Sequence, residues 1–316
     1  MKNYQVRRYE PNDFSLWNDF VHQAKNATFL FHRDFMEYHS DRFDDYSLMV
    51  FNESALVAIL PANKKDDVVH SHQGLTYGGF VFRENIKATS VHQIFLAVIN
   101  FLKMNTVKEF YIKPILPFYA KQNFLEIDCF IIQNKGKLYR KDLNLVVDLT
   151  RELCISKSKL KHFRKPITQQ LEMKKEKSFH LFWEEVLIPR LSEKHQVNPV
   201  HTHEEMAYLE KKFPQNIFQY NAYFEGQIVA GITIFEFDGV IKSQYGATTA
   251  LGEKLRALDF LFINLIQQSV GKFQYFDMGT VTENHGSSFN EGLLNQKQEL
   301  GCMVYAQDFY KIMLHD

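Results

Sequence analysis

The sequence predicts an α/β (α+β) protein of two tandem domains, residues 1–150 and 151–316, each with a mixed sheet flanked by helices. Length is one indication, because 316 residues exceed what one hydrophobic core usually serves. Composition is another, because 45% hydrophobic and 15% aromatic residues supply large cores and exclude a disordered chain. The third is a repeated order of elements in the two halves.

Each half is expected to run strand, turn, strand, strand, long helix, strand. The first half has expected strands at 46–51 and 55–62, a glycine-interrupted strand at 68–82, a helix at 88–104 and a strand at 109–113. The second half has expected strands at 219–224, 227–235 and 241–247, a helix at 252–270 and a strand at 273–277. A coincidence of common elements would also give this order, but duplication explains it more economically.

Charge and cysteine content limit the classes of function. Lys plus Arg and Asp plus Glu number 37 each, so no overall field draws the chain to DNA or a membrane, and any polyanion site must be local. Cys129, Cys154 and Cys302 form no CxxC pair, which is typical of a reducing compartment. Residues 1–13 lack the apolar core of a secretory signal, and the longest apolar run, 94–102, is too short to span a bilayer. We expect a cytoplasmic protein without membrane insertion.

The stretch 273–301 carries the candidate chemistry. An aromatic strand leads to Asp277 and breaks at Gly279, a polar loop at 280–288 holds Glu283 and Asn284, and a segment at 289–300 carries Lys297. Ionisable groups just past a core strand are where α/β proteins place ligands. The alternative is a structural strand followed by a solvated loop.

Four residues are the predicted catalytic group. Asp277 or Glu283 could take the proton from an attacking amine, and Lys297 could hold phosphate or a developing oxyanion. Tyr245, on the neighbouring predicted strand, could protonate a leaving group. All of them could equally be hydrogen-bonded residues at the edge of the core.

The predicted substrate-binding residues are polar or basic. Lys and Arg are frequent in 156–177, and Arg164 and Lys165 could bind the phosphates of CoA, a nucleotide sugar or tRNA, although most charge runs are solvated helix faces. The other predicted binding residues are His72, Gln73, Gln244, Asn284 and Asn290.

No metal site is expected. The histidine-rich stretch with His195, His201 and His203 lacks the HExxH spacing, and Thr202 to Glu205 reads as a capping box that opens a helix. Dinucleotide, P-loop and nucleophile-elbow motifs are also missing from the sequence.

The run 255–301 resembles the C-terminal part of GNAT-like acyltransferases of the Fem type. The residues that carry the resemblance are Phe276-Asp277-Met278-Gly279 and Gln296-Lys297-Gln298-Glu299-Leu300-Gly301. The resemblance implies two tandem GNAT-like domains and transfer of an acyl or aminoacyl group to an amine. The implied donor is acyl-CoA or aminoacyl-tRNA, the implied acceptor a cell-envelope precursor, and the resemblance places Lys297 at the active site.

Two departures from that family bear on the donor. Thr249-Ala250-Leu251-Gly252-Glu253-Lys254 stands where GNAT enzymes have their pyrophosphate loop, which weighs against acetyl-CoA. The helical arm inserted in some Fem enzymes is absent from the sequence, which weighs against tRNA. The sequence therefore leaves two hypotheses: a transferase acting on a cell-envelope precursor, amino sugar or amino acid derivative, and a non-catalytic binding protein that keeps the duplicated fold. In both, a pocket is expected among Gln244, Asp277 and Lys297.

Overall fold

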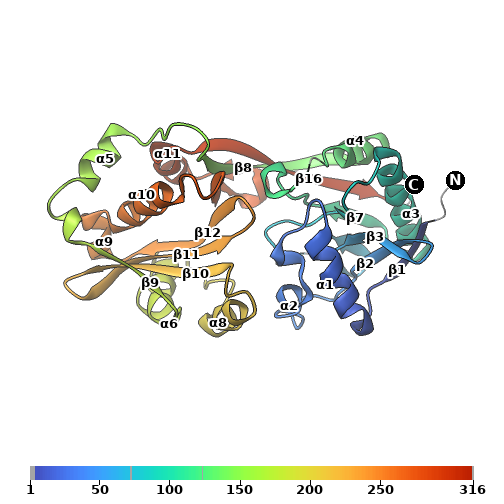
Figure 1. Ribbon diagram of the computed structural model, residues 1–316, viewed down its shortest axis with the longest axis horizontal. Helices are drawn as coiled ribbons and strands as arrows, with labels where there is room; N and C mark the ends of the chain where they lie inside the picture. Colours follow the sequence, from blue (N-terminus) through green and yellow to red (C-terminus); the bar gives the residue numbers. More distant parts are fainter. Residues whose placement is uncertain (1–3, 72, 123, 315–316) are drawn as a thin grey trace. The chain divides into compact units, whose positions relative to one another are not determined.

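The computed structural model describes residues 4–71, 73–122 and 124–314 (Figure 1). It divides into an N-terminal unit, made of residues up to Asp142 and from Gln307 onward, and a C-terminal unit, Leu143–Ala306. The boundary thus differs from the predicted one at residue 150, and the chain end returns to the first unit. The reason is strand pairing: in β16 (Met303–Met313), residues 310–313 pair with β7 (Glu109–Ile112).

The N-terminal unit holds the expected hairpin and long helix. One set of strands is ordered β1 (Tyr4–Arg8), β2 (Leu48–Asn52), β3 (Ala55–Leu60) and β6 (Val81–Phe82), and another is β4 (Asn63–Lys65), β5 (Val68–His70), β7 and β16. The helices are α1 (Phe14–Gln23), α2 (Arg33–Met36), α3 (Ala88–Met104) and α4 (Glu126–Gln133). Helix α3 has the predicted bounds because Val91, Phe95 and Leu102 bury one face at helical spacing.

The C-terminal unit is built on a sheet ordered β8 (Lys137–Asp148), β13 (Tyr275–Thr280), β12 (Val240–Thr248), β11 (Gln227–Glu236), β10 (Ile217–Phe224) and β9 (Glu172–Glu176). Its helices are α5 (Lys157–Phe163), α6 (His180–Phe182), the π-helical η5 (Trp183–Leu187), α7 (Ile188–His195), α8 (His203–Lys212), α9 (Ala250–Leu255), α10 (Ala257–Ser269) and α11 (Glu291–Glu299). A short hairpin, β14 (Thr282–Glu283) and β15 (Ser288–Phe289), precedes α11. Figure 1 shows α10 on one side of this sheet and α6 and α8 on the other.

Helix α10 covers the hydrophobic core of this unit. Ile263 and Ile266 of the helix are fully buried and belong to the same cluster as Ile232 and Phe276 of the sheet. Two helices, α9 and α10, occupy the position of the single helix predicted at 252–270. Arg256 adopts a left-handed conformation (φ 57°) that separates α9 from α10, and such a residue cannot continue a right-handed helix.

Strands β12 and β13 diverge toward their carboxyl ends. They pair in parallel only where Val240–Lys242 faces Tyr275–Asp277, although β12 continues to Thr248. On the other side of β12, the register with β11 shifts between Thr233 and Ile234, so that Gln244 lies in a bulge. Beyond Lys242, the side of β12 that faces β13 has no partner strand among the described residues; we call residues 243–248 the open edge of β12.

The predicted strand 273–277 begins and ends later than expected. Strand β13 continues through Gly279 to Thr280, and Gly279 takes a positive φ of 77° that residues with a side chain rarely adopt.

Within the described part of the chain, no helix has the length and apolar character needed to cross a bilayer.

Candidate functional site

A buried group of charged residues lies where β12 and β13 begin to diverge. Asp277 is 1% exposed; its carboxylate accepts hydrogen bonds from Asn144 Nδ2 at 2.9 Å and from the backbone N–H of Gly279 at 2.7 Å, and its Oδ2 lies 3.1 Å from Lys242 Nζ. Lys297 is buried beside them. We call Asn144, Lys242, Asp277 and Lys297 the lysine–aspartate cluster.

The ammonium group of Lys297 closes the turn after Asp277. Its Nζ donates to the carbonyl oxygens of Gly279 and Thr280, each at 3.1 Å. The pKa of Lys297 is lowered to about 8, first by burial and then by the neighbouring ammonium of Lys242, while Asp277 acts in the opposite direction. The side chain therefore braces the backbone at residues 279–280.

Helix α11 positions Lys297 through both of its ends. Asn290 caps the N-terminus, with its Oδ1 accepting from the N–H of Leu293 at 2.9 Å. Gly301, with φ 93°, follows the last turn, as predicted for a helix C-cap. Lys297 is nevertheless buried and donates to two backbone carbonyl groups, which is a structural role. Its catalytic role, like that of Asp277, stays a prediction.

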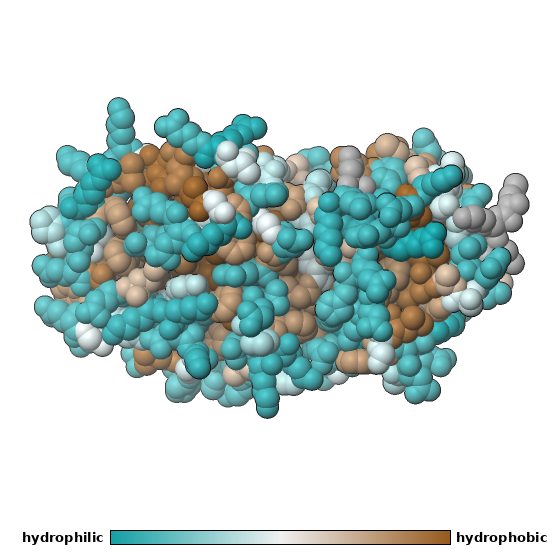
Figure 2. Space-filling view, viewed as in Figure 1, coloured by the Kyte–Doolittle hydropathy of each residue, from teal (hydrophilic) through white to brown (hydrophobic). Residues whose placement is uncertain are grey.

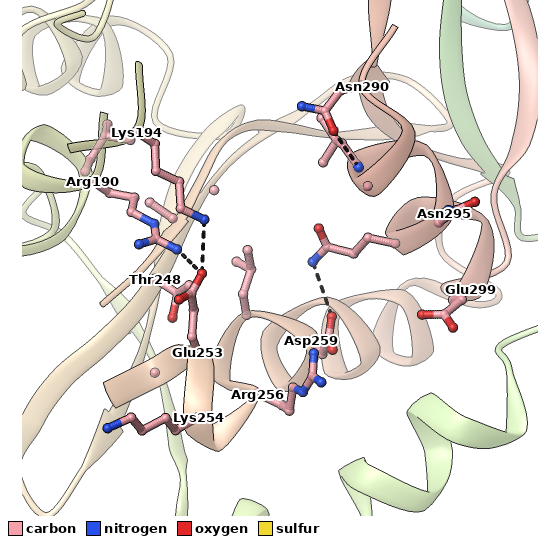
Figure 3. A pocket seen from close by; sticks show the side chains of 18 of the residues that line it. Arg190, Lys194, Thr248, Glu253, Lys254, Arg256, Asp259, Asn290, Asn295 and Glu299 are labelled. Carbon is pink, nitrogen blue, oxygen red and sulfur yellow. Dashed lines mark hydrogen bonds and ion pairs between the residues drawn. The ribbon is translucent and has the colours of Figure 1, made fainter. Parts of the chain in front are cut away.

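A cavity of about 970 Å³ lies in the C-terminal unit, and none of the four cluster residues lines it (Figure 3). It is lined by the end of β12 (Gly246, Ala247, Thr248), by α7, by α9 and the start of α10, and by α11. Figure 2 shows apolar surface framed by hydrophilic side chains in the region where Figure 1 places α5 and α10. The open edge of β12 therefore faces space that a ligand could occupy.

Two ion-pair groups line this cavity. Glu253 accepts from Arg190 and from Lys194, whose Nζ lies 3.1 Å away (Figure 3). Lys159 Nζ lies 2.8 and 2.7 Å from the two carboxylate oxygens of Asp259. The acidic residues Glu253 and Asp259 are thus neutralised by neighbouring cations.

The remaining cations form a positive rim. Lys254 and Arg256 line the cavity, are exposed, and have no ion pair within the described residues. The pKa of His162 is lowered mainly by Lys165, then by burial and by Arg256, which places these charges near one another. We call Lys254 and Arg256 the cationic rim; Lys165 lies near His162 but does not line the cavity.

The structure brings only part of the predicted site together. Asn290 lines the cavity, and its Nδ2 donates to Glu283 Oε1 at 3.1 Å. Asp277, Lys297, Gln244 and Tyr245 do not line it. This cavity is therefore not the pocket that was predicted among Gln244, Asp277 and Lys297. Asp277 and Lys297 are buried, Gln244 lies in the bulge, and Tyr245 packs against Trp183 of η5.

The other predicted binding residues have local roles or stand apart. Asn284 Nδ2 donates to Ser288 Oγ at 2.8 Å in the loop before α11. Arg164 and Lys165 follow α5, are exposed, and do not line the cavity. Gln73 belongs to the N-terminal unit and is hydrogen-bonded with Asn63. His72 and the side chain of His195 lie outside the described part of the structure.

Sequence reasoning missed three partners of the predicted residues. Lys242 and Asn144 each stand inside an apolar strand, and a polar residue at a buried position was the signal that could have found them. His201 pairs with Tyr245, at 2.5 Å between Nδ1 and Oη, while its own backbone N–H donates to the same oxygen at 3.2 Å. No local pattern indicates that contact.

Two glycines of the cavity wall allow a matched test of the packing. A Cβ on Gly252 would lie 2.1 Å from the carbonyl oxygen of Val229, whereas one on Gly246 would meet Phe262 at an ordinary 3.6 Å. Gly252→Ala is expected to lower the free energy of unfolding by about 1–3 kcal/mol, because backbone must move. Gly246→Ala, the control, is expected to change it by less than about 0.5 kcal/mol. Urea unfolding measures both, and equal effects would contradict the packing of α9 against β11.

Comparisons with known proteins agree with this architecture. No protein-family model and no curated protein matches the sequence. The structure is similar to that of FemX, with a TM-score of 0.68 and 9% identity over 98% of this chain and 97% of that one. It is also similar to L-PGS from Bacillus licheniformis, with a TM-score of 0.59 and 16% identity over 95% of this chain and 91% of that one. A tandem GNAT protein from the clavulanic acid biosynthesis pathway matches with a TM-score of 0.55 and 8% identity over 99% of each chain.

These similarities define the fold. The chain has a tandem GNAT fold of the kind seen in FemX, with mixed sheets flanked by helices. The resemblance expected from residues 255–301 is confirmed at that level.

Proposed function

We propose that the protein is an acyl- or aminoacyltransferase that acts in the cytoplasm. It would move an acyl group from a phosphate-bearing donor, acyl-CoA or aminoacyl-tRNA, to an amine of a cell-envelope precursor, amino sugar or amino acid derivative. The observation that carries the proposal is the open edge of β12 beside a cavity with a cationic rim. FemX, L-PGS and the tandem GNAT protein, which share the fold, support transfer chemistry of this general class.

The open edge supplies the acyl-binding part of the proposed site. Backbone N–H and C=O groups beyond Lys242 have no partner strand on that side in the described structure. Such groups require hydrogen-bond partners when they are removed from water, and an amide-containing arm or an aminoacyl group can pair with them as an added strand does. Gly246 leaves space for close approach, because a Cβ there would have only ordinary contacts.

The cationic rim supplies the phosphate-binding part. Arg forms paired hydrogen bonds with phosphate oxygens, and Lys acts as a point charge. Arg256 is notable because its left-handed backbone is uncommon for a residue other than Gly, Asn or Asp. Backbone strain retained at a cavity rim is typical of functional positions.

The proposed reaction needs a base and an acid. A neutral acceptor amine attacks the carbonyl carbon of the donor's thioester or ester; the C–N bond forms and the C–S or C–O bond breaks. We assign Glu283, linked to the cavity through Asn290, to take the amine proton. The leaving sulfur or oxygen would take its proton from solvent, because Tyr245 packs against Trp183 of η5 and pairs with His201 instead of lining the cavity. Asp277 and Lys297 would act by holding the turn at residues 279–280.

Substitution of Arg256 tests the donor site. Arg256→Asn keeps a residue that tolerates the left-handed backbone, so stability should be unchanged or slightly higher. Donor affinity should fall about tenfold to a hundredfold, because a charge-assisted hydrogen bond contributes about 1.5–3 kcal/mol. Ligand-induced rises in melting temperature, titrated with CoA thioesters and with an aminoacyl-tRNA analogue, measure this.

The control for that titration is Lys272→Gln, which removes an exposed cation that does not line the cavity. It should leave donor affinity unchanged. If neither donor raises the melting temperature of the unmodified protein, or if both substitutions weaken binding equally, the proposed donor site is wrong.

One observation favours a second candidate, a non-catalytic binding protein. The cavity acids Glu253, Asp259 and Glu299 are engaged in ion pairs and supply no unengaged base. Mass spectrometry of acceptor amines incubated with a bound donor separates the two candidates. Acyl transfer that Glu283→Gln reduces supports the enzyme, whereas donor binding without transfer supports the binding protein.

A further inference from the structure

Two histidines and a glutamate converge at the surface of the C-terminal unit, outside the cavity. His180 begins α6, Glu184 lies one helical turn later in η5, and His203 begins α8. His180 Nδ1 lies 3.4 Å from His203 Nε2, and Glu184 Oε1 lies 3.6 Å from the same nitrogen. One ligand atom from each residue lies within 4.8 Å of the others.

We propose that His180, Glu184 and His203 form a binding site for a divalent transition-metal ion, with Zn²⁺ as the best-fitting example. Zinc bonds to His nitrogen and carboxylate oxygen of about 2.0–2.2 Å, at tetrahedral angles, place two ligand atoms about 3.3–3.5 Å apart. The distances of 3.4 and 3.6 Å are close to that spacing. Three protein ligands leave a fourth position for water.

The charge distribution favours a cation at this point. Glu184 and Glu204 both approach His203, with Glu204 Oε1 at 3.1 Å from Nε2. Neither carboxylate is paired with Lys or Arg within the described residues. Imidazole and carboxylate together suit Zn²⁺, Co²⁺, Ni²⁺ or Cu²⁺, whereas Mg²⁺ and Ca²⁺ prefer oxygen ligands alone.

The segments that carry the ligands are held in place without an ion. Trp183, between His180 and Glu184 in the sequence, is 1% exposed, and its Nε1 donates to the carbonyl oxygen of His201 at 2.9 Å. The predicted capping box of α8 is present, with Thr202 accepting from the N–H of Glu205 and Glu205 accepting from that of Thr202. This box does not use the side chain of His180, Glu184 or His203, so helix capping and metal binding are compatible.

The expectation of no metal site considered His195, His201 and His203, and not His180 or Glu184. The spacing of His195, His201 and His203 does not suit a metal, and His201 instead pairs with Tyr245. The partners of His203 come from a helix some twenty residues earlier in the sequence. An ion bound there would link the segment 180–195, which lines the cavity with Arg190 and Lys194, to α8. Metal binding itself does not depend on the proposed transferase activity.

Calorimetric titration with Zn²⁺ tests the site, with Mg²⁺ as the comparison ion. The untagged chain should carry Cys129→Ser and Cys154→Ser, because these exposed thiols bind zinc independently. One equivalent of Zn²⁺ is expected to bind and to raise the melting temperature, and Mg²⁺ is expected to do neither. His180→Ala and His203→Ala should each weaken Zn²⁺ binding at least tenfold.

His285→Asn is the matched control. It removes an exposed histidine elsewhere in the same unit, at a left-handed position that Asn tolerates, and it should leave Zn²⁺ affinity unchanged. His180 is exposed, so its replacement should preserve folding, which circular dichroism checks. Absence of Zn²⁺ binding at submillimolar concentration, or equal affinity in His180→Ala and His285→Asn, would overturn the proposal.

Discussion

Asp277→Asn is expected to lower the free energy of unfolding by about 3–5 kcal/mol, the usual effect of removing one partner of a buried ion pair. Asp277 is 1% exposed, and its carboxylate is the negative charge next to two buried ammonium groups, Lys242 and Lys297. The amide of Asn is neutral, and its NH₂ group would face either the Lys242 ammonium or the Asn144 amide. Urea unfolding at pH 7 measures the loss.

Two further variants make this prediction specific. Asp238→Asn changes an exposed aspartate of the same unit and should alter stability by less than about 0.5 kcal/mol. Adding Lys242→Met to Asp277→Asn removes one unpaired ammonium and should recover part of the loss. A loss below about 1 kcal/mol for Asp277→Asn would show that the cluster does not hold the fold together.

The free energy of unfolding of the unmodified protein, minus that of Lys297→Met, should rise between about pH 8 and pH 10.5. The pKa of Lys297 is about 8 in the folded chain against 10.5 for an unburied lysine, so in this window the unfolded chain binds more protons than the folded one. Stability then increases with pH. The expected gain is about 3 kcal/mol, because a tenfold change in a protonation equilibrium corresponds to about 1.4 kcal/mol.

The comparison with Lys297→Met removes the contribution of groups that do not interact with Lys297, since these titrate alike in both chains. Lys272→Met replaces an exposed lysine. Its free energy of unfolding should differ from that of the unmodified protein by an amount that does not change with pH over the same window. A flat difference for Lys297→Met as well would mean that the Lys297 ammonium is not destabilised by its surroundings.

These two predictions separate folding from chemistry. The lysine–aspartate cluster lies beneath the turn at residues 279–280, whereas the cavity is lined by Gly246, Arg256 and Asn290. We therefore expect stability to respond mainly to the cluster, and donor affinity mainly to the cavity. A transferase assay would have to compare variants at equal folded fractions before any catalytic role is assigned to Asp277.

The sequence by itself determined several elements and much of their extent, but not the strand predicted at 68–82, which is two short strands in different sheets, β5 and β6. The hairpin β2–β3, the bounds of α3 and the capping box of α8 follow from alternation, helical spacing and the Thr202–Glu205 pair. Each of these signals links residues only a few positions apart. The tandem GNAT fold followed from the resemblance of residues 255–301.

Only the tertiary structure decided which charged residues meet and where the cavity lies. Asp277 contacts Asn144 and Lys242, which are 133 and 35 positions away, and His203 meets His180 across 23 positions. Local periodicity contains no information on such pairs, because they form where the path of the folded chain brings distant segments together. The same reason explains why Lys297, chosen for its motif, is buried, while Arg256 reaches the cavity from a break between helices.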